Sequence, residues 1–562
     1  MNTTYRLRDS HKQNISIGLS LIVCLLLFAP VKADDYYTYL GGALSDTAYA
    51  ITSDAQGNIY VTGNTNSATF DGFDPIQNKF YFNQNCFITR VNLQNPNKNY
   101  YFEFAGNERE SCRAIAVDSN GNVYVTGETQ STNLPMTTNQ AFGGQWDAFV
   151  IKLDRNGELD YASYIGGELV DYGHGIAIKD EDNVFITGET WSQNFPTTDN
   201  AYMQNCVTNN ACDGEKANAF IAQIDTSNPN LYHSNYSSYL GGKNHDKAHA
   251  IAIDGNGILH IAGETGSSDF PLANSLSNRL KGSFDGFISH IDPSLSSTDS
   301  LVFSTYLGGN GDDFITAIAA DASGNSYVTG DTTSDDFPTT SNSFSQQCAN
   351  GKIECLPDNS NSQHTDIFVS KFRNNKLIYS TLFGGTKNET AHAIGVNSEN
   401  HILLTGKTFS DNFPLTDNAN DSRCNQTTQC ATVSDGVVIK IDPDGNGKNS
   451  LLYASYLGGN QSDTYRSLQI NASGELLLTG ETESSNIAST SAIDKTAENL
   501  EAFLQKLTID NHGTWVEEQT VTKTRVTNSA LNPYYLLSLL LISLVLRRFR
   551  TKISLDSYSA IS

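Results

Sequence analysis

A unit of about 70 residues recurs seven times along this chain, and this repeat constrains the fold more than any other feature. Its anchor is Tyr-Leu-Gly-Gly, found at 39–42, 239–242, 306–309 and 456–459, with variants that end at Gly106, Gly167 and Gly385. Counted from the last glycine of each anchor, successive repeats begin 64, 61, 75, 67, 76 and 74 residues apart. Such a period is typical of architectures in which each unit packs against its neighbours.

Each unit predicts four short strands. In the second repeat, the alternating apolar stretch 114–118, the turn 119–122 and the β-rich run 123–129 form a hairpin signature. A third apolar run follows at 148–154, and the approach to the next anchor is 159–167. Four short strands per unit predict one blade of a β-propeller.

The seven blades are expected to close into one ring, because a single blade cannot bury both faces of its sheet and neighbouring blades can. The predicted fold is therefore an all-β, seven-bladed propeller with four antiparallel strands per blade. Strand 36–40 has the sequence of a fourth strand and is expected to complete the last blade beside 501–508; the competing strand is 514–518.

The strand after each anchor is predicted to be the innermost strand of its blade. Eight residues past the anchor the side chain is small, and the next one is always Ile or Leu, so a small face is expected to meet a bulky face of the neighbouring blade. The small positions are Ala50, Ala114, Gly175, Ala250, Ala317, Ala393 and Ser467.

These elements resemble the bacterial SBBP-type β-propeller repeat, with its Tyr-Leu-Gly-Gly, Asp-x-x-Gly-Asn, Tyr-Val-Thr-Gly and Phe-Pro elements. The resemblance covers about residues 36 to 507. It implies the fold and little else, since propellers host unrelated functions, and no catalytic residue carries over from it.

The chain ends predict export. Residues 1–33 have the basic, apolar and small-residue regions of a secretory signal peptide, which places the propeller at 34–510 and a linker at 511–530. Residues 531–552 combine a short apolar helix with a basic cluster, followed by a cytoplasmic tail at 553–562. This helix is either a permanent membrane anchor or a removable tail, since the layout also resembles Gram-negative C-terminal sorting signals.

Eight cysteines remain after the signal peptide, and an even count in an exported chain predicts disulfides. Three tight pairs lie in the three longest connections between second and third strands, and the last two cysteines are predicted on the same rim. The pairs are Cys206 with Cys212, Cys348 with Cys355, Cys424 with Cys430, and Cys86 with Cys112 as candidates for the fourth. Stapled loops on one rim suggest either a recognition surface or protection from proteolysis.

A carboxylate stands four residues past every anchor. It either belongs to an acidic ring that holds a hard cation such as Ca²⁺, or accepts backbone amides within its own blade and stabilises closure. Apart from this possible Ca²⁺, we expect that the protein requires no cofactor. The seven carboxylates are Asp46, Glu110, Asp171, Asp246, Asp313, Glu389 and Asp463. A second set follows the Thr-Gly glycines at Glu128, Glu189, Glu264, Asp331 and Glu481, interrupted by Asn64 and Lys407.

Seven residues past each anchor the side chain varies between blades, so this position is the better candidate for specific ligand binding. Its three histidines are also candidate metal ligands or bases. The seven residues are Tyr49, Arg113, His174, His249, Thr316, His392 and Arg466.

The functional expectation is a non-enzymatic, exported scaffold that binds a protein or glycan of the cell envelope through its loop-rich rim. The net charge of −26 argues against nucleic acid as a partner. One alternative is a hydrolase or lyase that acts on polysaccharide with carboxylates around the central pocket. Another is a purely structural module of the envelope.

Overall fold

The computed structural model describes residues 36–70, 72–73, 84–206, 215–347, 364–426, 430, 433–487, 492–495 and 499–509. The predicted signal peptide, linker, C-terminal helix and cytoplasmic tail lie outside these residues, as do Cys212, Cys348 and Cys355. The chain divides into two units, Met1–Glu517 and Glu518–Ser562, and all described residues belong to the first. No helix within the described residues is long and apolar enough to cross a membrane.

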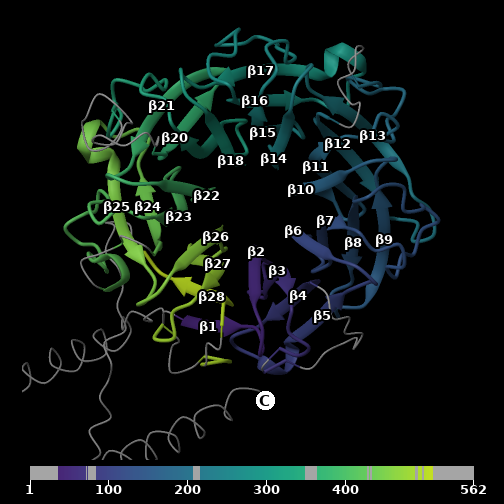
Figure 1. Ribbon diagram of the computed structural model, residues 1–562, viewed down its shortest axis with the longest axis horizontal. Helices are drawn as coiled ribbons and strands as arrows, with labels where there is room; N and C mark the ends of the chain where they lie inside the picture. Colours follow the sequence, from purple (N-terminus) through teal and green to yellow (C-terminus); the bar gives the residue numbers. More distant parts are fainter. Residues whose placement is uncertain are drawn as a thin grey trace, which may run out of the picture. The chain divides into compact units, whose positions relative to one another are not determined.

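Seven four-stranded antiparallel sheets form the blades of a propeller, as predicted (Figure 1). The first strands are β2 (Asp46–Ser53), β6 (Glu110–Val117), β10 (Asp171–Asp180), β14 (Asp246–Ile253), β18 (Asp313–Ala320), β22 (Glu389–Val396) and β26 (Asp463–Ile470). The second strands are β3 (Ile59–Thr65), β7 (Val123–Thr129), β11 (Asn183–Thr190), β15 (Leu259–Thr265), β19 (Ser326–Thr332), β23 (Ile402–Thr408) and β27 (Leu476–Thr482).

The third strands are β4 (Asn85–Val91), β8 (Asp147–Leu153), β12 (Asn218–Asp225), β16 (Asp285–Ile291), β20 (Asp366–Arg373), β24 (Asp435–Ile441) and β28 (Glu501–Leu507). The fourth strands are β5 (Tyr100–Phe104), β9 (Leu159–Ile165), β13 (Ser234–Leu240), β17 (Leu301–Leu307), β21 (Lys376–Phe383), β25 (Leu451–Leu457) and β1 (Tyr36–Leu40). Single 3₁₀ turns occur at η1 (Pro96–Lys98), η2 (Ser297–Ser300), η4 (Cys424–Gln426) and η5 (Gly447–Ser450).

The N-terminal strand closes the ring. Strand β1 pairs antiparallel with β28, in a register that runs from Tyr36 opposite Lys506 to Leu40 opposite Ala502. This confirms the prediction that one strand from the start of the chain completes a blade built from its end. The competing strand 514–518 lies outside the described residues.

The first strand of each blade is the innermost, again as predicted (Figure 1). Small and bulky positions meet between neighbouring blades: a Cβ added to Gly175 would lie 3.2 Å from Cγ2 of Ile251 in the next blade. At the closure, the amide of Ile51 donates to Oγ of Ser467, 3.3 Å away. The first strands begin earlier than expected, since β6 starts at Glu110 rather than 114.

Every first strand carries a β-bulge, which the sequence did not predict. In the fourth blade the register moves from Ala248 to Ala250 and leaves His249 unpaired in the ladder; the other six blades show the same shift. The bulge explains the Thr-Gly glycine of each repeat. A Cβ on Gly263 would lie 1.8 Å from the carbonyl oxygen of Lys247, so only glycine fits opposite the bulge.

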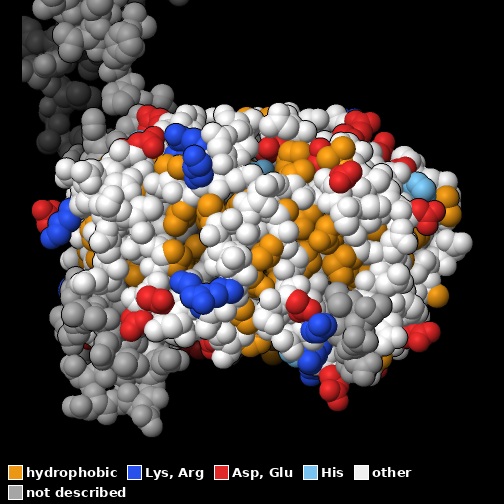
Figure 2. Space-filling view, turned by 90° about the horizontal axis from the view of Figure 1, so that it is seen from above, with side chains coloured by type: hydrophobic (Ala, Val, Ile, Leu, Met, Phe, Trp, Pro, Cys, Tyr) orange, Lys and Arg blue, Asp and Glu red, His pale blue; other side chains and the backbone are white. Residues whose placement is uncertain are grey.

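Two rims follow from this topology. We call the rim that carries the fourth-to-first and second-to-third connections the entry rim, and the rim that carries the first-to-second and third-to-fourth turns the turn rim. On the outer edge between them, Figure 2 shows a band of hydrophobic side chains, with charged side chains mostly nearer the rims.

The disulfide Cys86–Cys112 joins β4 to β6 of the next blade, with Cα atoms 5.2 Å apart.

Candidate ligand-binding site

The seven variable positions of the sequence are the seven bulge residues, and all are partly exposed on the inner strands. We call this set the bulge ring; its members are Tyr49, Arg113, His174, His249, Thr316, His392 and Arg466. A bulge turns a side chain out of the ladder, and bulges are common beside functional sites. The fold therefore points one blade-specific side chain from every blade toward the axis of the ring.

Four members of the bulge ring pair with carboxylates of the second acidic set, always 15 residues further along the same blade. Arg113 contacts Glu128 at 2.6 Å and Arg466 contacts Glu481 at 2.6 Å. The other two pairs are His174 with Glu189 and His249 with Glu264, each at 3.3 Å. The constant spacing is a signal that sequence reasoning missed, because it treated the two sets separately.

The bulge ring has a cationic sector where the ring closes. The guanidinium of Arg113 lies 4.8 Å from the ring centre of Tyr49, and that of Arg466 lies 5.1 Å from it. Both arginines belong to the blades on either side of the blade that carries Tyr49. The cation–π contacts and the two carboxylate pairs fix this sector in one arrangement.

A second sector combines imidazoles and carboxylates. The rings of His174 and His249 lie 5.8 Å apart, and Nζ of Lys247 lies 3.6 Å from carboxylate oxygens of both Glu189 and Glu264. Burial would raise the pKa of Glu264, but hydrogen bonds and positive charge from His249 and Lys247 hold this pKa below its usual value. Glu264 is therefore ionised at neutral pH.

The fold does not place His392, the third histidine of the bulge ring, beside His174 and His249. His392 lies beyond Thr316 in the ring order, and its Nε2 has no hydrogen-bond partner among the described residues. Burial, together with the positive charges of Arg466 and Lys407, lowers the pKa of His392 to about 3. His174 and His249 are adjacent, whereas His392 stands apart as a neutral imidazole.

The seven carboxylates of the predicted acidic ring are buried, and each accepts a hydrogen bond from the amide of its own anchor glycine at 2.7–3.0 Å. Hydroxyl groups supply further donors. For example, Oδ2 of Asp246 accepts from Ser267 at 2.8 Å, and its Oδ1 accepts from Thr265. Each carboxylate thus ties an anchor turn to the blade that follows. Burial raises the pKa of Asp246 and Asp313 to about 7.

A second carboxylate or amide lies beside each of these, at the first position of the third strand, and sequence reasoning missed it. The two acids meet around the first anchor glycine: a Cβ on Gly458 would lie 2.4 Å from Oδ1 of Asp435 and 2.4 Å from Oδ2 of Asp463. Burial first, and then the charge of Asp463, raise the pKa of Asp435 to about 9. The seven residues at this position are Asn85, Asp147, Asn218, Asp285, Asp366, Asp435 and Glu501.

One group of three potential metal ligands is found among the described residues: Asp411, Cys424 and Cys430. The two cysteines form a disulfide, as predicted, so their thiolates are not available to a metal. Cys206 is also disulfide-bonded, and its expected partner Cys212 lies outside the described residues. The acidic ring supplies one carboxylate per blade, and its use by Ca²⁺ stays a prediction.

An arc of half-buried aromatic side chains lies on the entry rim next to the bulge ring, and sequence reasoning missed it. Tyr172 is 5.8 Å from both Trp146 and Trp191, and Trp191 is 6.5 Å from His245. A second pair, Phe284 and Phe314, lies 6.1 Å apart in the following blades, with Gly266 between it and His245. We call these six residues the aromatic arc: Trp146, Tyr172, Trp191, His245, Phe284 and Phe314.

The aromatic arc is built by loop ends. Trp146 immediately precedes β8, Trp191 immediately follows β11, and Tyr172 is the second residue of β10. Backbone hydrogen bonds of 2.9 Å hold these ends together, from Asp171 to the carbonyl of Trp146 and from Trp191 to that of Val170. Tyr172 also lies 6.2 Å from His174, so the arc is continuous with the bulge ring.

Comparison with known proteins identifies the repeat. The SBBP beta-propeller repeat model matches residues 35–71, 103–135, 160–196 and 302–338. The curated regulatory protein FlaEY of Caulobacter vibrioides is 24% identical over 257 residues, which are 43% of this chain and 25% of that protein. The match thus spans about a quarter of the length of that relative.

Among solved structures, the Pan2 WD40 domain of Neurospora crassa has a TM-score of 0.36 and 8% identity, covering 84% of this chain and 97% of its own. Sqt1 of Chaetomium thermophilum has a TM-score of 0.34 and 11% identity, covering 80% and 96%. The family model itself matches this chain at four of its seven repeats, as the SBBP beta-propeller repeat.

Proposed function

We propose that this protein is a non-catalytic binding scaffold of the bacterial cell envelope, and that the aromatic arc on its entry rim holds a glycan. The observation that carries the proposal is the continuity of the arc with the bulge ring. Partly exposed aromatic rings offer flat apolar surfaces to sugar rings, and neighbouring imidazole and carboxylate groups can form hydrogen bonds with sugar hydroxyls.

The disulfides favour an exported protein. Cys86–Cys112 and Cys424–Cys430 both lie in the propeller, and such bonds persist in oxidising compartments and are rare in the cytosol. Export agrees with the signal peptide predicted at residues 1–33. A surface location, by membrane anchor or after removal of a sorting tail, belongs to the same proposal.

The charges near the arc favour binding over catalysis. A polysaccharide-acting hydrolase needs one carboxyl group whose pKa is raised so that it can donate a proton. Three carboxyl groups beside the arc do have a pKa raised to about 7, but they are buried and accept hydrogen bonds from glycine amides: Asp147, Asp246 and Asp313. The partly exposed carboxylate of this sector is Glu264, and His249 and Lys247 lower its pKa, so it can accept hydrogen bonds from a ligand but is not a proton donor at neutral pH.

Tryptophan fluorescence offers a direct test, because two of the three tryptophans of the chain, Trp146 and Trp191, lie in the arc. The protein is screened on a glycan array, and hits are titrated by fluorescence. Trp191→Ala should weaken binding about tenfold or more, since one stacked aromatic ring contributes on the order of 1–2 kcal/mol.

The matched control is Leu231→Ala, which removes an exposed apolar side chain (46% exposed) outside the arc and should leave binding unchanged. Binding that survives loss of both tryptophans would contradict the arc as the site. Capture of a protein ligand through the same tryptophans, with no glycan bound, would retain the site and reject the glycan.

A further inference from the structure

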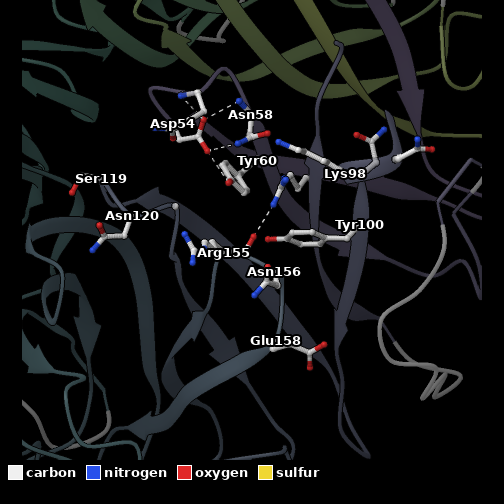
Figure 3. A pocket seen from close by; sticks show the side chains of 15 residues that line it. Asp54, Asn58, Tyr60, Lys98, Tyr100, Ser119, Asn120, Arg155, Asn156 and Glu158 are labelled. Atoms are coloured by element: carbon white, nitrogen blue, oxygen red, sulfur yellow. Dashed lines mark hydrogen bonds between the residues drawn. The ribbon is translucent and has the colours of Figure 1, made fainter. Parts of the chain in front are cut away.

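A pocket of about 880 Å³ lies between the first two blades on the turn rim, whereas the aromatic arc lies on the entry rim. Figure 3 shows the pocket. Its first wall comes from the β2–β3 turn, β4, η1 and the start of β5. Its second wall comes from the β6–β7 turn and the β8–β9 turn. In Figure 3, Lys98 and Tyr100 stand on one side and Ser119 and Asn120 on the other.

Three cations line this pocket in a chain whose net charge is −26. They are Arg90, Lys98 and Arg155, and none of them forms an ion pair within the described residues. The carboxylate of the first wall, Asp54, already accepts hydrogen bonds from Gln56, Asn58 and Tyr60. The other, Glu158, is exposed at the end away from Lys98 (Figure 3).

Two buried polar groups of the lining lack partners. Tyr100 is only 6% exposed, and its hydroxyl has no hydrogen-bond partner among the described residues. Nε of Arg90 is buried without a partner too, although Nη1 donates to the carbonyl oxygen of Arg155 at 2.7 Å. Buried polar groups are nearly always satisfied, so two such donors beside a cationic pocket indicate a ligand that accepts hydrogen bonds.

Other blades show what a structural cation looks like at the position of Arg90. Lys152, the equivalent residue of the second blade, contacts Asp182 at 3.1 Å and Asp160 at 3.4 Å. Lys506 contacts Glu475 at 2.8 Å. Arg90 has no such carboxylate among the described residues, so its charge is left available to the pocket.

The corresponding groove between the sixth and seventh blades has similar size, about 750 Å³, but only Lys440 as a cation among its described lining residues. The charge is therefore a property of the first groove and not of the fold. A single phosphate would occupy a small part of 880 Å³, whereas three separated cations and asparagines on both walls match a ligand with several anionic groups and hydroxyls.

We propose that the groove between blades one and two is a binding site for an acidic oligosaccharide, with uronate carboxylates held by Arg90, Lys98 and Arg155. The hydroxyl of Tyr100 and Nε of Arg90 donate to its oxygens. This site is separate from the aromatic arc and does not depend on the function proposed above.

The test is calorimetric titration of the protein with a galacturonate trimer and with its methyl ester, which keeps the sugar rings and removes the charges. The acid should bind at least tenfold more tightly than the ester, and added salt should weaken it. Equal binding of acid and ester, or binding of neither, overturns the proposal. Inorganic phosphate that displaces the trimer at equal concentration overturns the saccharide as its ligand.

Variants separate this site from the rest of the molecule. Lys98→Ala and Arg155→Ala remove exposed cations and should each weaken binding about tenfold, whereas Lys448→Ala, an exposed lysine in the equivalent 3₁₀ turn η5, should not. Tyr100→Phe should weaken binding severalfold without lowering Tm, because the hydroxyl it removes has no partner within the described protein.

The control for Tyr100→Phe is Tyr101→Phe, which removes another buried hydroxyl without a hydrogen-bond partner among the described residues, outside this pocket. Unchanged binding by Tyr100→Phe together with unchanged binding by Arg155→Ala would overturn the proposal. Trp146→Ala and Trp191→Ala should leave trimer binding intact, so failure of the arc and failure of this pocket give different results.

Discussion

Asp435→Asn should make the propeller more stable at alkaline pH. Burial, and then the neighbouring Asp463, raise the pKa of Asp435 from 3.8 to about 9 in the folded protein. Between pH 3.8 and about pH 9, the folded state therefore keeps a proton on Asp435 that the unfolded state has released. The stability contributed by this protonated carboxyl group is fully present below pH 3.8 and is lost as the pH rises toward 9.

The size of the effect follows from the two pKa values. One pH unit between them changes the free energy of unfolding by about 1.4 kcal/mol, so the loss between pH 5 and pH 8 is about 4 kcal/mol. For a cooperative unit of about 470 residues, unfolding entropy is about 1 kcal/mol/K, which converts this loss into about 4 °C of Tm. Asparagine cannot ionise, so Asp435→Asn should not show this pH-dependent loss of stability.

The assay is thermal unfolding of the wild type and Asp435→Asn from pH 5 to pH 8, followed by circular dichroism. The Tm of the variant should rise relative to the wild type by about 4 °C over this range. Asparagine already occupies the equivalent position at Asn85 and Asn218, so the substitution has a precedent in the chain itself. Asn218→Asp is the reciprocal variant and should make the Tm fall more steeply with pH.

Parallel Tm curves for wild type and Asp435→Asn would refute the reasoning, because they would mean that Asp435 has the same charge in the folded and unfolded states across this range. A steeper fall in the variant would refute it as well.

Two further predictions concern the bulge and the acidic ring. Gly263→Ala should lower the free energy of unfolding by about 1–3 kcal/mol or more, because the added Cβ would meet the carbonyl oxygen of Lys247. An unchanged midpoint in denaturant unfolding would contradict the role of glycine opposite the bulge. Millimolar Ca²⁺ should leave the Tm unchanged, because each carboxylate of the acidic ring already accepts hydrogen bonds from a glycine amide and from hydroxyl groups. A saturable rise in Tm would instead support a calcium site.

The number of blades, the innermost strand and the closure by 36–40 could be predicted because they depend on patterns that repeat within the sequence. The bulge could not, because it is a shift of register between two strands and leaves each strand's alternation nearly intact. Its signature, a glycine that admits no Cβ, looks in the sequence like an ordinary turn residue. Gly263 is such a case.

The sites were harder to predict for a different reason. Tyr49 and Arg466 are 417 positions apart and meet only because the ring closes, and Trp146 reaches Tyr172 only through packing between blades. No repeated pattern in the sequence points to the turn rim as a binding surface. The basic pocket there depends on Arg90 lacking the carboxylate that Lys152 and Lys506 have in other blades, which only tertiary structure reveals.

Ring closure also sets an order of events in biogenesis. Tyr39 lies opposite Phe503, so β1 cannot find its partner until all the other blades have been synthesised. Long-range pairing of this kind is slow to form. Until then two sheet edges are open, and any truncation before residue 501 leaves them so. The chain should therefore be most prone to aggregate, and most dependent on chaperones, just before β28 is synthesised.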